Sequence, residues 1–349
     1  VAKPADSAPA AFAAHPNPIL QWSYRVWCQT GYRMVNEGGT GQPVDALVDP
    51  TLDLASPKGF VYNTSARPMP PGGVQFMDNA WYFGTDYLGA VVVKTPDGLL
   101  LFDALTTADD AQTQLLDQMV TAGLDPRQIK YIFLGHEHGD HLGGVNLIRR
   151  DYAPDVKVVA TRPAAASISA SRMRAENATY PGSAEEAAAA KARRLLSIPE
   201  RVDILVEPFE GIDNGLMHVS TGASSVVSAM LTPGHTPGQL TAIVPVQHQG
   251  TTRKLLVWSG NDNMEKGDQY ATSTDFIQSQ AVREGADAFI NTHAYQGAIF
   301  SHLRRLKADP SVANPMLMGG DGLRRYLGVY ANCQRAGAQR LRDGTWKSL

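Results

Sequence analysis

Residues 135–141, GHEHGDH, hold three of the nine histidines of the chain and two acids. The run follows an apolar stretch, 129–134, that predicts a buried strand, and it precedes an expected helix. A strand end fixed in the core can hold short loop side chains that point at one spot, as metal binding requires. Imidazoles bind zinc at about 2.0–2.1 Å and carboxylates at about 2.0–2.2 Å, so this loop can serve two adjacent metals. We favour this over a histidine-bearing surface loop because the other six histidines are spread along the chain.

Two more histidines occupy positions suited to ligands. His235 is in a turn, TPGHTPG at 232–238, between two expected strands, and its prolines and glycines restrict the backbone around the imidazole. His293 ends the apolar stretch 288–292, which predicts another buried strand.

The elements that must position these residues alternate hairpin-rich β segments with helices. A strand pair is expected over 74–83, then a hairpin of strands 88–94 and 99–102 around a TPDG turn, and a helix over 108–122 that ends at Gly123. Further strands are predicted at 156–160, 202–206, 216–220, 225–232, 239–246 and 254–258, and helices at 142–152, 274–284, 298–307 and 322–340. A two-sheet core with helices outside is the economical architecture.

Two regions are expected to be additions to this core. Residues 1–73 are predicted to form an N-terminal extension that packs on a main domain of residues 74–349, with buried packing for the aromatics Trp22, Tyr24, Trp27 and Tyr32. Residues 163–196 predict two helices, the second with little apolar face, and we favour an exposed helix over a lid across a site.

Together the 136–141 motif, the turn at His235 and the strand-terminal His293 resemble the metallo-β-lactamase superfamily in order and spacing. The resemblance covers about 74–340, and within the superfamily it is strongest to the third subclass of zinc β-lactamases. It implies an α+β fold, the αββα sandwich, with two Zn2+ ions per chain. The implied first-zinc ligands are His136, His138 and His235, and the implied second-zinc ligands are Asp140, His141 and His293. Asp103, which ends the 99–102 strand, would support the metal loop.

One stretch departs from the commonest superfamily pattern. Many of these hydrolases have a Gly-Asp after a strand, and the Asp bridges both metals, whereas this chain has Asn261 after Gly260. Either the bridge is absent, as in the third subclass, or Asp262 takes its place. We favour the absent bridge, because the strand ending at Trp258 should aim Asn261 at the usual bridging position.

The resemblance implies a hydrolase in which a metal-bound hydroxide attacks a carbonyl carbon. Asp140 is the expected catalytic residue, because its carboxylate can orient the nucleophile as well as bind metal. A β-lactam amide is the favoured substrate. A lactone, ester or thioester is the alternative, and a catalytically silent metal-binding protein is disfavoured by the complete ligand set. Four other histidines, His15, His218, His248 and His302, match no position of the family.

Composition restricts the partners. The net charge is -3 and the basic residues are scattered pairs, so no nucleic-acid partner is indicated and a small-molecule substrate is expected. No apolar run approaches the ~20 residues of a membrane span. Cys28 and Cys333 can form a disulfide or remain two buried thiols. The Ala/Pro-rich start, which lacks Met, is typical of a chain trimmed after export or in the laboratory, and a periplasmic or secreted location is expected.

Overall fold

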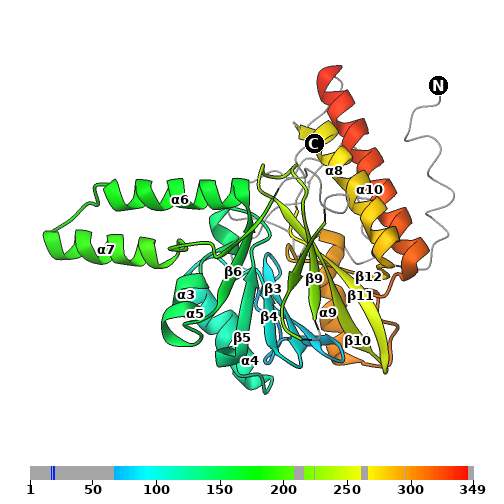
Figure 1. The fold of residues 1–349 in the computed structure, drawn as a ribbon, viewed down its shortest axis with the longest axis horizontal. Coiled ribbons are helices and arrows are strands. Elements are labelled where there is room, and N and C mark those ends of the chain that lie inside the picture. The colour runs from blue at the N-terminus through cyan, green and yellow to red at the C-terminus, as the bar shows by residue number, and fades with distance from the viewer. Residues whose placement is uncertain are drawn as a thin grey trace.

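Two β-sheets pack face to face, and helices cover their outer sides (Figure 1). The computed structural model describes Asn17, Ile19 and residues 67–207, 216–223, 225–260, 266–294 and 296–344. The expected α+β fold, the αββα sandwich, is confirmed over these residues.

The first sheet has the strand order β1-β2-β3-β4-β5-β6-β7. It begins as an antiparallel meander and continues with parallel strands from β4 to β7. Its strands are β1 (Val74–Met77), β2 (Ala80–Gly84), β3 (Gly89–Thr95), β4 (Gly98–Phe102), β5 (Ile129–Phe133), β6 (Lys157–Thr161) and β7 (Ile204–Val206). Parallel pairing places the carboxyl ends of β4 and β5 at one edge, which is where Asp103 and His136 follow.

The second sheet has the order β12-β11-β10-β9-β8. Its strands are β8 (Met217–Ser220), β9 (Val226–Leu231), β10 (Leu240–His248), β11 (Thr251–Trp258) and β12 (Ala288–Asn291). β11 and β12 are parallel, whereas β8, β9, β10 and β11 pair antiparallel with their neighbours. The turn between β9 and β10 carries His235, and β12 leads directly to His293.

Alternating side chains on the strands divide the core in two. Val91 and Val93 of β3 face the second sheet and join the larger apolar cluster. Ala90 and Val92 of the same strand face the other way, into a cluster with the helices that follow β4 and β5. Both faces of the first sheet are therefore buried, as expected for its largely apolar strands.

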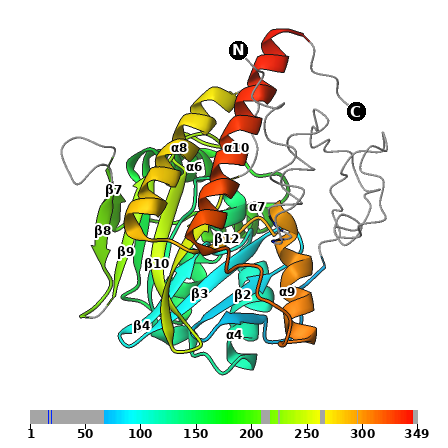
Figure 2. The same ribbon diagram turned by 90° about the vertical axis from the view of Figure 1, so that its right-hand side faces the viewer.

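Helices close both outer faces (Figures 1 and 2). On the first sheet lie α3 (Ala108–Asp110), a π-helical segment (Ala111–Leu116), α4 (Asp117–Thr121) and α5 (Val145–Asp151). On the second lie α8 (Gly267–Glu284) and α10 (Gly319–Arg342), which pack along each other. A further helix, α9 (Ile299–Ala308), packs against β1 of the first sheet. The π-helical segment corrects the prediction of one regular helix over 108–122, because apolar spacing does not distinguish one widened turn.

A helical hairpin, α6 (Arg162–Asn177) and α7 (Ala184–Leu196), projects from the sandwich (Figure 1). Ser183 and Glu186 form a capping box that starts α7, and α7 has no buried residue. Arg172 of α6 holds the base of the hairpin by donating to the carbonyl oxygens of Leu195 and Ile198. α7 is therefore exposed, as the sequence favours.

The expected N-terminal extension lies almost entirely outside the described residues, as do Cys28, the four aromatics from Trp22 to Tyr32, and His15. Of its described members, Ile19 is fully buried in the larger cluster and Asn17 donates to the carbonyl oxygen of Pro315. The division at residue 73 stays a prediction. Cys333 is disulfide-bonded, which agrees with the first of the two alternatives for the cysteines. Among the described helices, none is both long and apolar enough to cross a membrane.

Candidate metal centre

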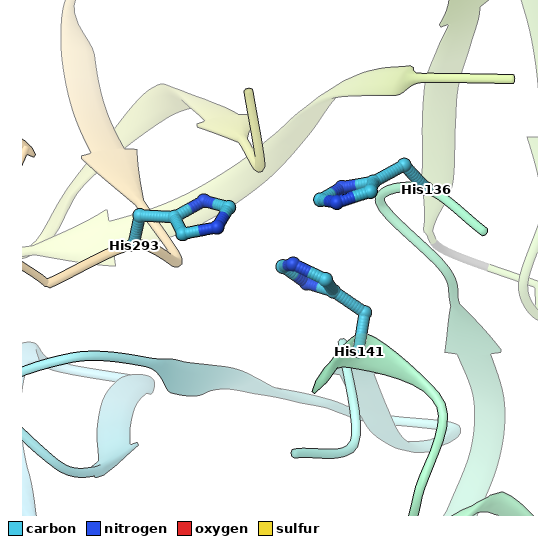
Figure 3. Close-up of side chains that lie close together, drawn as sticks. All are labelled: His136, His141 and His293. Atoms are coloured by element: carbon cyan, nitrogen blue, oxygen red, sulfur yellow. The ribbon is translucent and has the colours of Figure 1, made fainter. Parts of the chain in front are cut away.

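Strand ends from both sheets meet at one edge of the sandwich. His136 follows β5, and His141 ends the short 3-10 helix Gly139–His141 in the same loop. His293 follows β12 in the other sheet. Figure 3 shows these three imidazoles pointing toward one another. Their candidate ligand nitrogens lie within 4.8 Å of one another, and all three residues are buried.

His136, His138 and His235 form a second close group. Nδ1 of His138 lies 3.2 Å from Nε2 of His136 and 3.1 Å from Nε2 of His235. These are the residues expected at the first zinc. Three ring nitrogens that converge on one spot cannot all hydrogen-bond as donor–acceptor pairs, whereas one cation can accept a lone pair from each.

Asp140 brings a carboxylate to the other side of the centre. Its Oδ2 lies 3.7 Å from Nε2 of His141 and 4.0 Å from Nε2 of His293. These are the residues expected at the second zinc. The structure therefore brings all six expected ligands together, and His136 lies close to both sets.

Burial keeps most of these imidazoles uncharged. Desolvation, followed by the neighbouring histidines, lowers the pKa of His136 and of His293 well below the usual value. The same causes lower the pKa of His235 to about 3. A neutral imidazole offers the lone pair that a metal binds, so these rings are in the ligand form at neutral pH.

Asp103 fixes the orientation of His141. It is fully buried, and its carboxylate accepts from the backbone N–H of Gly135 at 2.7 Å and from Oγ of Ser259 at 2.8 Å. Its Oδ2 also lies 2.7 Å from Nδ1 of His141. This contact leaves Nε2 of His141 directed at the centre. The supporting role expected for Asp103 matches this geometry.

The same contact sets the charges of both groups. Burial alone would lower the pKa of His141, but the charge and hydrogen bond of Asp103, with the charge of Asp140, outweigh it and raise that pKa. Burial alone would raise the pKa of Asp103, but His141 and the Gly135 N–H outweigh it and lower that pKa. Asp103 therefore remains a carboxylate at neutral pH.

The donor set fits a metal. Nε2 of His141 is buried and has no hydrogen-bond partner among the described residues, although the Asp140 carboxylate lies beside it. A buried nitrogen without a partner costs free energy that a bound cation would recover. Imidazole and carboxylate ligands without sulfur suit zinc and its neighbours in the first transition series.

Tyr87 is a site residue that the sequence did not reveal. It lies just before β3, and its hydroxyl donates to Oδ2 of Asp140 at 3.2 Å. Its ring meets that of His293 edge-on, with centroids 6.3 Å apart. The available signal was its place at the start of a strand predicted to neighbour the strand ending in Asp103. The sequence does not indicate the register in which these strands pair.

The remaining candidates lie elsewhere or outside the described residues. Asn261 and Asp262 fall in the latter class, so the question of a bridging carboxylate stays a prediction. His218 on β8 contacts Ser228, His248 ends β10, and His302 is buried on α9. None of these three belongs to a ligand group found among the described residues.

A model of a known protein family matches part of the chain and agrees with the observed fold. Residues 90–240 match the family model described as the metallo-β-lactamase superfamily. The matched residues include the 136–141 loop and the His235 turn. The resemblance inferred from the histidine motifs is therefore confirmed over this part of the chain, and it supports the prediction of a metal-dependent hydrolase.

Solved structures of metallo-β-lactamases share the architecture. FEZ-1 from Legionella gormanii is 19% identical, with a TM-score of 0.57 over 80% of this chain and 98% of that chain. BJP-1 of Bradyrhizobium japonicum, a subclass B3 metallo-β-lactamase, is 21% identical, with a TM-score of 0.55 over 80% and 97%. MIM-1 from Novosphingobium pentaromativorans is 18% identical, with a TM-score of 0.53 over 80% and 92%. At such identities the likeness concerns the fold.

Proposed function

We propose that the protein is a hydrolase with two zinc ions, held by His136, His138 and His235 and by Asp140, His141 and His293. The observation that carries the proposal is the convergence of these six side chains from separate strand ends, with His136 close to both sets. A structural metal site is normally closed by four protein ligands, whereas three ligands per metal leave positions for water and substrate.

Zinc held here would supply a nucleophile at neutral pH, because it lowers the pKa of a bound water to about 7. The chain's own residues prepare the site for this chemistry. Asp103 holds His141 through Nδ1, so that Nε2 faces the centre. Asp140 places a carboxylate at the same centre, where it would orient the nucleophile by accepting a hydrogen bond, and the Tyr87 hydroxyl donates to that carboxylate.

The proposed substrate is a β-lactam, whose amide carbonyl would be attacked with opening of the ring. Support comes from the ligand set, which contains no cysteine, and from the shared fold of enzymes named as metallo-β-lactamases. A shared fold does not determine the substrate, so substrate class must be measured.

The decisive experiment combines metal analysis with turnover. Purified protein is analysed for bound metals, then tested for hydrolysis of a cephalosporin, an acyl lactone and a thioester, before and after chelation and zinc return. We expect two zinc ions per chain, fastest turnover with the cephalosporin, and loss of activity in chelator. Full activity in metal-free protein would refute the zinc mechanism, and faster turnover of the lactone or thioester would redirect the proposal to that substrate.

We further propose that the protein works in an oxidising compartment, in the periplasm or outside the cell. The disulfide at Cys333 supports this, because such bonds persist chiefly in exported proteins. Fractionation of cells that express the full gene tests the proposal. Recovery of the protein only from the cytoplasm, with reduced cysteines, would contradict it.

A further inference from the structure

Glu137 lies between two of the proposed ligands, His136 and His138, but it belongs to neither ligand group found among the described residues. Its carboxylate instead reaches the turn that carries His235. Oε2 accepts from the Thr236 hydroxyl at 2.7 Å, and Oε1 accepts from the Gly238 N–H at 3.3 Å. One side chain therefore joins the two loops that would supply the first metal.

The far end of this connection is rigid. The carbonyl oxygen of Gly238 accepts from the buried hydroxyl of Thr161, the N-cap residue of α6, at 2.7 Å. The Gly238 N–H is held by Glu137, so both polar groups of this residue are fixed. A Cβ at Gly238 would lie 2.6 Å from Oε2 of Glu137 and 2.5 Å from the backbone nitrogen of Ala164. Only glycine allows the three segments to approach this closely.

The position of His235 depends on this turn. His235 directly precedes Thr236, whose side chain is almost fully buried. His138, the residue after Glu137, approaches His235 to 3.1 Å between ring nitrogens. A carboxylate with two donors is a strong, directional link, since hydrogen bonds to charged groups are about twice as strong as neutral ones.

We propose that Glu137 is a positioning residue that fastens the His235 turn to the His136–His138 loop and so sets the geometry of the first metal's three ligands. The inference rests on the proposed metal-dependent function. Glu137 does not act as a base in this arrangement, because both carboxylate oxygens are engaged by the turn. Residues that orient metal ligands typically change metal affinity about 10–100-fold when they are replaced.

The test measures metal affinity rather than turnover. Metal-free wild-type protein, Glu137→Ala and Glu137→Gln are titrated with Zn2+ against a chromophoric chelator, and with Co2+ while its visible spectrum is recorded. We expect Glu137→Ala to weaken one of two metals about 10–100-fold, to change the Co2+ spectrum of that metal and to leave the other affinity unchanged. Glu137→Gln should lie between, since its amide keeps one acceptor oxygen. Glu185→Gln, an exposed change on α7, should behave as wild type.

A second pair of variants tests the same connection in case Glu137→Ala does not fold. Thr236→Val removes the hydroxyl donor and should weaken the same metal, whereas Thr236→Ser keeps the hydroxyl and should restore wild-type affinity. Wild-type affinity for both metals in Glu137→Ala, or equal affinities in the two Thr236 variants, would overturn the inference alone. A wild-type protein that binds no transition metal would overturn the proposed function, and the inference with it.

Discussion

The hydroxyl of Tyr87 lies 3.2 Å from Oδ2 of Asp140, the carboxylate proposed to hold the second metal. The two residues come from different parts of the first sheet region: Tyr87 precedes β3, and Asp140 lies in the loop after β5. The contact gives a fixed donor to the same oxygen that lies nearest His141 and His293, and this limits the rotation of the carboxylate.

Tyr87→Phe should weaken the second metal and slow turnover about tenfold, because a hydrogen bond to a charged group contributes about 1.5–3 kcal/mol and part of this is recovered by water. Zinc titration and steady-state kinetics measure both effects. Tyr152→Phe is the matched control, since its hydroxyl contacts Gln112 on the outer helices. Equal second-metal affinity in wild type and Tyr87→Phe would show that the contact has no role in metal binding.

His235→Ala should lower turnover at least about 100-fold and remove one metal, since loss of a ligand costs several kcal/mol of transition-state stabilisation. The fold should persist because His235 lies in a turn outside both apolar clusters. His138→Ala should behave in the same way. His218→Ala, on the exposed side of β8, is the control, and metal analysis with circular dichroism distinguishes ligand loss from unfolding. Near-normal turnover in His235→Ala would exclude it as a ligand.

Asp103→Asn should reduce both stability and second-metal affinity. Asp103 has a φ of 62°, a left-handed conformation that Asn also tolerates, so the change removes the charge without adding backbone strain. The new amide cannot accept from Gly135, Ser259 and His141 together, and a buried partner is left unsatisfied at a cost of about 1–3 kcal/mol. Urea unfolding of the metal-free protein checks the stability. A variant as stable as wild type would argue against the proposed orientation of His141.

The ionisation of Asp203 should make the free energy of unfolding depend on pH. Burial would raise its pKa, but the Val158 N–H, Arg201 and Arg149 outweigh burial and lower it. A carboxylate whose pKa is lowered in the folded state stabilises the protein at pH values above its unfolded-state pKa, about 3.9. This stabilisation is lost as the pH falls through the folded-state pKa. Burial lowers the pKa of Arg149. Part of the attraction between Arg149 and Asp203, which are 2.5 Å apart, therefore offsets the cost of removing the guanidinium from water.

Asp203→Asn should therefore unfold more easily than wild type by about 1–3 kcal/mol at pH 7, and the difference should shrink below about pH 4. Urea unfolding of both proteins between pH 3 and 7 measures this. Asp151→Asn, which alters an exposed pair with Arg150, should change little. A difference that stays constant down to pH 3 would contradict the assignment to this carboxylate.

Asp262→Asn tests the absent bridging carboxylate. If the second metal rests on Asp140, His141 and His293, the variant keeps two metals per chain. A stoichiometry that falls from two to one on titration would show that Asp262 bridges the metals, and would favour esterase-like or phosphodiesterase-like chemistry.

The sequence by itself determined the strands and the loops that we propose to bind metal. Apolar runs at 129–134 and 288–292 ended in histidines, and the 136–141 spacing restricted the chemistry, because few residue types bind zinc and they must be close to one another. The turn at His235 was visible for a different reason, because prolines and glycines have strong local conformational preferences. These features depend on neighbours along the chain, so the sequence displays them.

Apart from Asp103, whose supporting role the family resemblance implied, only the tertiary structure decided which side chains support the proposed ligands. Tyr87 and Asp140 are separated by 53 positions, and Glu137 and Gly238 by 101, and no local pattern relates either pair. Their contacts depend on strand register and on the packing of one loop against another, which are set by the whole core rather than by any segment. The sequence shows Glu137 only as an acid between two histidines, and in the folded chain the geometry of both loops turns its carboxylate toward the His235 turn.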